Sequence, residues 1–342
     1  EELLNTINSV KEIFERFKQS EEIASLYSMV LVNLSAKQVN VEERINTVNS
    51  VKEIFELFRH SEDIALQYAK ALVNLAAKQE NIEELLNTIN SVKEIFELFR
   101  HSEDIALQYA KALVNLAAKQ ENIEELLNTI NSVKEIFGSF KQSEEIALRY
   151  AFALGYLSVE QQNVEELLNT INSVKEIFER FKQSEEIASL YSMVLVNLSA
   201  KQVNVEERIN TVNSVKEIFE LFRHSEDIAL QYAKALVNLA AKQENIEELL
   251  NTINSVKEIF ERFKQSEEIA SLYSMVLVNL SAKQVNVEER INTVNSVKEI
   301  FELFRHSEDI ALQYAKALVN LAAKQENIEE LLNTINSVKE IF

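Results

Sequence analysis

Histidine has the widest chemical repertoire of the side chains in this chain, and its four copies all lie in one string, Arg-His-Ser-Glu-Asp. They are His60, His101, His224 and His306. The string contains a metal ligand and the residue types of a Ser-His-Asp triad. However, the closest histidines are 41 residues apart, whereas ligands of one ion must converge, and sequence neighbours at a helix junction cannot form a relay by themselves. We therefore interpret each His as a helix C-terminal residue that interacts with the helix dipole.

The other candidate groups are interpreted in the same way. Carboxylate pairs such as Glu83-Glu84 and Glu103-Asp104 are ordinary residues for the first turn of a helix. Gly138 and Gly155 are the sole glycines, so no phosphate-binding loop is present, and the absence of Cys excludes thiolate metal sites. We expect no catalytic residues, no metal site and no cofactor.

Composition limits the class of protein. The 342 residues include 46% hydrophobic residues and carry a formal net charge of −20. The apolar fraction excludes disorder, and the chain has no long uncharged apolar run for a membrane. The negative charge weighs against nucleic acid as a ligand. No targeting signal opens the chain at Glu1, and both ends fall inside a helical pattern. We therefore interpret the sequence as a fragment of a longer array, and the compartment stays open.

The chain is built from one repeated unit. The pentapeptide Val-Lys-Glu-Ile-Phe recurs every 41 residues from Val10 to Val338. Residues 1–82 recur letter for letter as 165–246 and as 247–328, and 124–164 is the divergent unit. We divide one continuous array, 1–342, into the units 1–41, 42–82, 83–123, 124–164, 165–205, 206–246, 247–287 and 288–328, with a partial unit 329–342.

Each unit predicts two helices. Ser102–Gln120 is apolar around most of its surface and should pack on both sides, with Ser102 as its N-cap. The other helix starts after an Asn N-cap such as Asn81 or Asn122 and has one apolar face. Connections of two or three residues would make successive helices antiparallel. Because 41 is not a multiple of seven or eleven, one long coiled coil is excluded. We predict an all-α fold, an α-solenoid of stacked helix pairs.

The divergent unit carries a family resemblance. Its segments Tyr150–Tyr156, with a Leu-Gly pair, and Gln161–Leu167, with a Gln-Gln-Asn turn, resemble the tetratricopeptide repeat. The repeat here is seven residues longer, which is about two helical turns. The resemblance implies that helices of the Ser102–Gln120 type line a concave groove and that the Asn-capped helices form the convex side.

In that geometry, three columns of side chains point into the groove. The first two columns contain Gln, Lys and Met, and the third is a column of Asn, which is a poor residue for the middle of a helix. The resemblance implies that this Asn column pairs with the backbone of an extended peptide. The candidate binding residues are Arg149, Phe152, Tyr156, Lys70, Asn74, Lys111, Asn115, Met193, Asn197, Lys234 and Asn238. Arg149, Phe152 and Tyr156 are residue types enriched in binding hot spots. Each hypothesis has an alternative. In the first alternative the Asn residues are simply solvent-exposed positions, and in the second Phe152 and Tyr156 fill the space that Gly155 leaves.

Two functional hypotheses follow, and neither is an enzyme. One is a protein-interaction scaffold that binds a peptide or protein segment in the groove. The other is a structural or synthetic repeat array that associates end to end through its apolar terminal faces.

Overall fold

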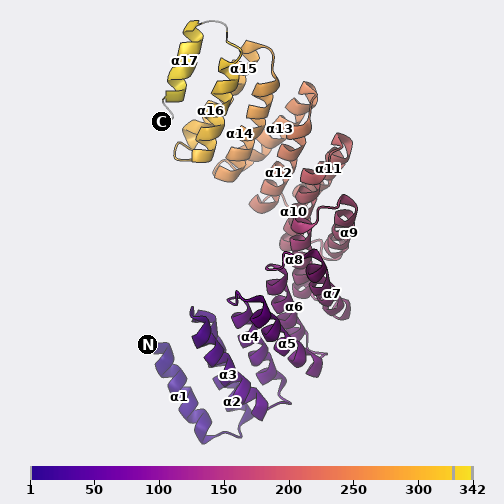
Figure 1. Ribbon diagram of the computed structural model, residues 1–342, viewed down its shortest axis with the longest axis vertical. Helices are drawn as coiled ribbons and strands as arrows, with labels where there is room; N and C mark the ends of the chain where they lie inside the picture. The colour runs from indigo at the N-terminus through magenta and orange to yellow at the C-terminus, as the bar shows by residue number, and fades with distance from the viewer. Residues whose placement is uncertain (1, 326–327, 340–342) are drawn as a thin grey trace. The chain divides into compact units, whose positions relative to one another are not determined.

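The computed structural model describes residues 2–325 and 328–339, and all regular structure in these residues is helical (Figure 1). The helices are α1 (Glu2–Arg16), α2 (Glu21–Lys37), α3 (Val41–Leu57), α4 (Glu62–Ala76), α5 (Ile82–Leu98), α6 (Glu103–Ala117), α7 (Ile123–Ser139), α8 (Glu144–Glu160), α9 (Val164–Arg180), α10 (Glu185–Lys201), α11 (Val205–Leu221), α12 (Glu226–Lys242), α13 (Ile246–Arg262), α14 (Glu267–Lys283), α15 (Val287–Leu303), α16 (Glu308–Ala322) and α17 (Ile328–Lys339). They form two compact units, residues 1–161 and 162–342.

The predicted helix starts are confirmed. The hydroxyl of Ser102 accepts a hydrogen bond from the backbone N–H of Ile105, and the side chain of Asn122 accepts from the N–H groups of Glu124 and Glu125. These caps satisfy donors that the first helical turn leaves unpaired. Every even-numbered helix starts at such a Ser, and the odd-numbered helices from α3 to α15 start at such an Asn. The sequence therefore specifies the alternation of the two helix types.

The connections are three to five residues long, and those that follow the odd-numbered helices are longer than expected, at four residues. The reason is local: α5 ends at Leu98, Phe99 leaves the helical region at φ −122° and ψ 49°, and the N–H of Ser102 donates to the carbonyl of Phe99. This turn is needed because Ser102 must be extended to cap α6.

In each of the two compact units the helices form two layers, one of even-numbered and one of odd-numbered helices. Within residues 1–161 and within residues 162–342, each even-numbered helix packs on the next even-numbered helix, and each odd-numbered helix packs on the even-numbered helices of the same unit that precede and follow it. The even-numbered helices are therefore enclosed on several sides: in α6, Ile105, Ala106, Ala110 and Ala112 have no exposed surface. Small Ala side chains allow this close approach. The predicted all-α solenoid packing of helix pairs is confirmed.

Aromatic pairs join the two layers in every repeat. Phe96 of α5 and Tyr109 of α6 have ring centroids 5.5 Å apart, a separation typical of favourable aromatic contacts. Burial raises the pKa of Tyr109 to about 12, with Glu97 and Glu135 adding to the shift. The pair recurs with nearly constant geometry, from Phe14 and Tyr27 to Phe301 and Tyr314, so each helix pair is assembled in the same way.

Candidate functional site

Three cations lie along the even-numbered helices of residues 1–161. Lys70 of α4, Lys111 of α6 and Arg149 of α8 are each partly buried, and the helices that carry them pack side by side. We call these three residues the basic strip. The pKa of Lys111 is lowered, first by burial and then by the charge of Arg149, while Glu145 opposes the shift and Lys70 adds to it. The structure therefore places three like charges on neighbouring helices of a chain whose net charge is −20.

The divergent α8 supplies the aromatic part of this surface. The guanidinium carbon of Arg149 lies 5.7 Å from the ring centroid of Phe152, in cation–π range. The Nε of Arg149 is buried and has no hydrogen-bond partner in the structure. Phe152 is half-buried, and Tyr156 is exposed one turn further on. Arg149 and Phe152 therefore form one contact, and the predicted hot-spot role of the trio stays a prediction.

The candidates in residues 162–342 form a different surface. Met193 and Asn197 of α10 and Lys234 and Asn238 of α12 are all half-buried. Lys234 has Met193 and Met275 in the same position of the neighbouring even-numbered helices, so no second cation is next to it. The residues of this range that the structure describes therefore form no counterpart of the basic strip.

Three residues of the Asn column, Asn74, Asn238 and Asn320, have a structural role. The side-chain amide of Asn74 donates to the hydroxyl of Ser35 on α2 at 2.9 Å, and Asn238 donates to Ser199 on α10 at the same distance. The third pair is Asn320 and Ser281. Each bond joins two adjacent even-numbered helices and satisfies a half-buried amide. The Asn115 position differs, because α4 presents Ala76 where α2 presents Ser35.

A buried arginine accompanies each of these pairs. Arg208 of α11 is only 2% exposed and donates to the carbonyl oxygens of Gln202, at the end of α10, and Asn238, in α12. Arg44 and Arg290 make the same pair of bonds. Burial lowers the pKa of Arg208. Gln202 follows the last residue of α10, and carbonyls at a helix C-terminus lack intrahelical partners and carry partial negative charge, so the cation compensates its carbonyl.

Two of the repeats without this arginine use a lysine for the same purpose. Leu85 and Leu249 occupy the position of Arg44 and Arg208. In these repeats the carbonyl of Gln79 accepts a hydrogen bond from Lys119, which lies at the end of the next even-numbered helix, and Gln243 accepts one from Lys283. The sequence analysis predicted neither the buried arginine nor the lysine that replaces it. A comparison of the repeats could have indicated the arginine, because the repeats with Arg in place of this Leu also have Ser in place of Ala in the preceding helix.

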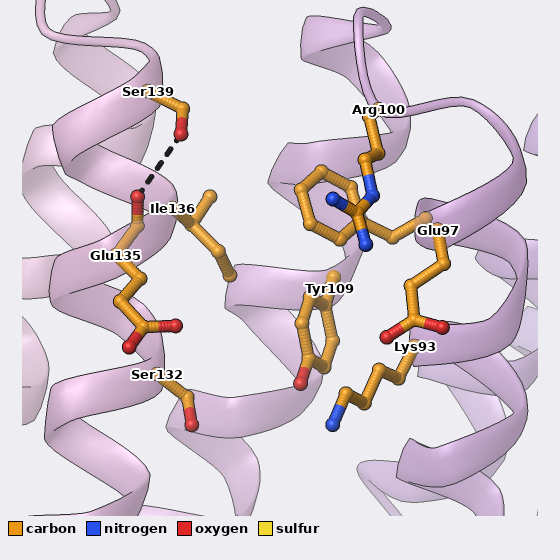
Figure 2. A pocket seen from close by; sticks show the side chains of 9 residues that line it. Lys93, Glu97, Arg100, Tyr109, Ser132, Glu135, Ile136 and Ser139 are labelled. Carbon is orange, nitrogen blue, oxygen red and sulfur yellow. Dashed lines mark hydrogen bonds between the residues drawn. The ribbon is translucent and has the colours of Figure 1, made fainter.

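A hollow of about 280 Å³ lies between α5 and α7 (Figure 2). Tyr109 lies behind it, between Lys93 of α5 and Ser132 of α7, and Arg100 and Glu135 are at its edges. A similar hollow one repeat earlier is lined by the matching residues, including Lys52, Tyr68 and Ser91. Because it recurs with the repeat, this hollow results from the spacing between odd-numbered helices and is not a site particular to one repeat.

Each histidine lies in the turn that follows an odd-numbered helix. His60 and His101 are exposed in the turns that follow α3 and α5. In the part of the chain that the structure describes, no group of three or more His, Cys, Asp or Glu residues is placed to hold a metal ion. Among the same residues, no helix has both the length and the apolar character needed to cross a membrane.

The fold and these surfaces define the class: an all-α tandem repeat protein of the solenoid type. No family model matches the sequence, and no curated protein matches it. One similar solved structure, described as "Computational Design of Self-Assembling Cyclic Protein Homooligomers", is 16% identical, covers 94% of this chain and 94% of its own, and has a TM-score of 0.13. At that score the class rests on the helices described above, and the tetratricopeptide resemblance stays a prediction.

Substitutions of the buried Arg208 test whether its hydrogen bonds to the two carbonyls stabilise the fold. Arg208→Ala removes the hydrogen bonds to the carbonyls of Gln202 and Asn238 and opens a cavity, so we expect a loss of about 2–4 kcal/mol in the free energy of unfolding. Arg208→Leu should cost less than about 1 kcal/mol, because Leu fills this position in other repeats and Lys242 occupies the place from which Lys119 bonds Gln79. Urea denaturation followed by circular dichroism measures both. Equal losses would contradict this account of the arginine.

Proposed function

We propose that this chain is a structural repeat scaffold whose copies associate end to end. One observation carries the proposal. Ile13 of α1 is 48% exposed, whereas Ile259 of α13, in a sequence-identical repeat, is 2% exposed. The two residues differ in their neighbours: α13 packs on both α12 and α14, and α1 packs on α2. The surface that α1 leaves open is therefore one that this protein elsewhere covers with its own repeats.

The open surface continues onto α2. Leu26 and Met29 are exposed there, whereas their sequence counterparts Leu272 and Met275 in α14 are half-buried beside α12. An apolar face of this kind is one that stable monomers rarely present to water. Residues from two successive helices contribute to it, so it is broad enough for a helix pair of another copy.

A complementary face lies on α16. Val319 is 62% exposed and Leu312 is exposed, whereas the matching Val237 and Leu230 of α12 are half-buried. The two faces are therefore the two sides of the contact that α12 makes with α14. Two different surfaces that fit each other form a head-to-tail contact, which extends into rings or filaments.

The energetics favour reversible association. Complete burial of five such side chains would contribute at most about 7–15 kcal/mol. Association itself costs about 4–15 kcal/mol in lost translational and rotational freedom. Because these terms are of similar size, we expect association to depend strongly on protein concentration.

Sedimentation velocity over a range of protein concentrations tests this function. The intact chain should sediment faster as its concentration rises. Val319→Glu should remove most of that dependence, because it places a charge in the proposed contact, and it should leave helix content unchanged, because Val319 is exposed. The matched control is Leu57→Glu, which adds the same charge at a 63% exposed Leu of α3. Concentration-independent sedimentation of the intact chain would refute the proposal.

A second candidate function is favoured by the basic strip. We propose that it binds an acidic peptide segment of a partner along α4, α6 and α8. Burial and neighbouring positive charge destabilise the charged form of Lys111, and a carboxylate placed between Lys111 and Arg149 would reverse that effect. Phe152 adds an apolar contact beside the cations, and this pairing of Arg with an aromatic is typical of binding hot spots.

Fluorescence anisotropy with a labelled hexaglutamate peptide tests the second candidate. Lys111→Glu should weaken binding by about tenfold or more, because it inverts the middle charge of the strip. Lys234→Glu is the matched control, since Lys234 holds the same repeat position between two Met residues. Its binding should be unchanged. The second candidate fails if both variants bind the peptide equally well.

A further inference from the structure

This inference rests on the proposed end-to-end association and concerns how the contact forms. Residues 1–14 and 329–342 have the same sequence, and so do residues 247–260. More broadly, 1–82 is identical to 247–328, and 206–243 is identical to 288–325. A second copy approaching α16 with its α1 and α2 therefore presents the same residues that α13 and α14 present to α12.

The structure shows what that contact looks like inside one chain. Lys283 at the end of α14 donates to the carbonyl of Gln243, just after α12. Leu249 and Val256 of α13 have no exposed surface. These contacts fix the position of α13 and α14 on the preceding repeat. In the proposed assembly, Lys37 of the second copy corresponds to Lys283, and Gln325 of the first copy corresponds to Gln243.

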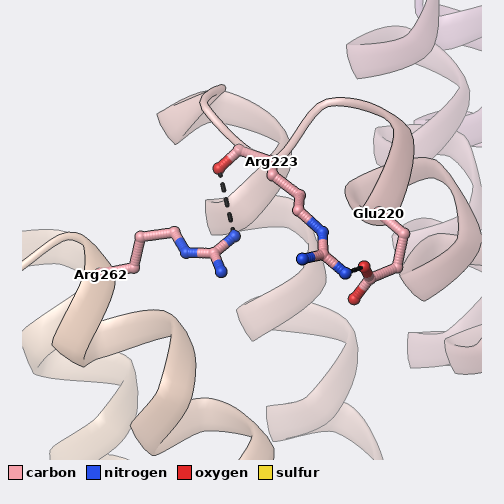
Figure 3. Close-up of polar contacts among 3 residues, drawn as sticks. All are labelled: Glu220, Arg223 and Arg262. Atoms are coloured by element: carbon pink, nitrogen blue, oxygen red, sulfur yellow. Dashed lines mark hydrogen bonds and ion pairs between the residues drawn. The ribbon is translucent and has the colours of Figure 1, made fainter.

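A third contact lies at the other end of α13 (Figure 3). Arg262 donates to the carbonyl oxygen of Arg223 at 3.4 Å, beside the ion pair of Arg223 and Glu220. The guanidinium of Arg262 also lies 5.6 Å from the ring centroid of Phe219. Arg16 of a second copy is the sequence counterpart of Arg262, and Arg305 is that of Arg223. The two ends of this chain therefore hold matching donors and acceptors.

Helix α17 already occupies the surface of α16 on which α1 of a second copy would pack. Helix α17 packs on α16, and the Thr334 hydroxyl donates to the side chain of Gln325 at 2.8 Å. However, its other side is open: Ile335 is 42% exposed, whereas the matching Ile253 of α13 is 4% exposed. Helix α17 therefore makes only part of the contact that α13 makes.

We propose that α1 and α2 of a second copy displace α17 from α16 and rebuild there the contact that α13 and α14 make with α12. The incoming pair contributes two helices, while α17 contributes one of the same sequence. The α1 and α17 helices thus compete for one surface, and the added contact of α2 with α16 decides the competition. Exchange of an identical segment between copies is a low-cost route to assembly, and its partner is a second copy of this chain.

Matched proline variants test the exchange, because Asn8 of α1 and Asn336 of α17 are the same position of the same sequence and both are exposed. A proline inside a helix disrupts it. Asn336→Pro weakens the competitor, so the dissociation constant from sedimentation should fall about tenfold or more. Asn8→Pro damages the incoming helix, so it should rise by a similar factor. Circular dichroism checks that each variant otherwise keeps its helices.

The outcomes separate this inference from the proposed function. If the intact chain associates but both prolines weaken association equally, α17 is part of the contact surface and exchange is wrong. If neither the intact chain nor any variant associates, the proposed function itself is wrong.

Cross-linking identifies the contact directly, because the chain has no Cys. Lys37→Cys combined with Gln325→Cys, treated with a short bis-maleimide, should give a ladder of linked chains. Lys283→Cys combined with Gln243→Cys places the same pair inside one chain and should give linked monomers only. The proposed exchange is wrong if the first variant gives no ladder under conditions in which the unsubstituted chain associates.

Discussion

Burial against the neighbouring repeat is the interaction on which this structure depends. A single helix pair cannot cover the apolar surface of its even-numbered helix, because residues such as Ile105 and Ala110 lie on different sides of α6. The side chains are covered only when α4 and α8 are both present. The stability of each repeat is therefore shared with the repeats before and after it, as in other arrays with nearest-neighbour interactions.

The polar groups between repeats follow from the same constraint. Packing even-numbered helices side by side brings their C-terminal carbonyls near one another, away from full hydration. The chain compensates these carbonyls with a cation in two ways, through the buried Arg208 within the connection or through Lys119 from the next repeat. A guanidinium with no carboxylate partner is tolerated there because the helix ends supply the negative partial charge. Its Nε stays unpaired.

Much of this fold could be predicted from the sequence, because its determinants are local. The 41-residue period, the Ser and Asn caps and the apolar registers predicted the helix pairs and their starts. The lengths of the connections were less accessible, since they depend on how Phe99 leaves the helix. The Asn column illustrates the limit best: its role in Asn74 depends on Ser35, which lies 39 residues earlier and comes close only through helix packing. The peptide-binding role of the column stays a prediction.

Because residues 1–82 and 247–328 are identical in sequence, the effect of position can be separated from the effect of residue type. The most direct measurement compares Ile259→Ala with Ile13→Ala in urea denaturation at low protein concentration, followed by far-ultraviolet circular dichroism. If neighbours determine burial, Ile259→Ala should cost about 2–4 kcal/mol and Ile13→Ala less than about 1 kcal/mol. Equal losses at the two positions would show that each repeat is stable by itself, and would contradict the account.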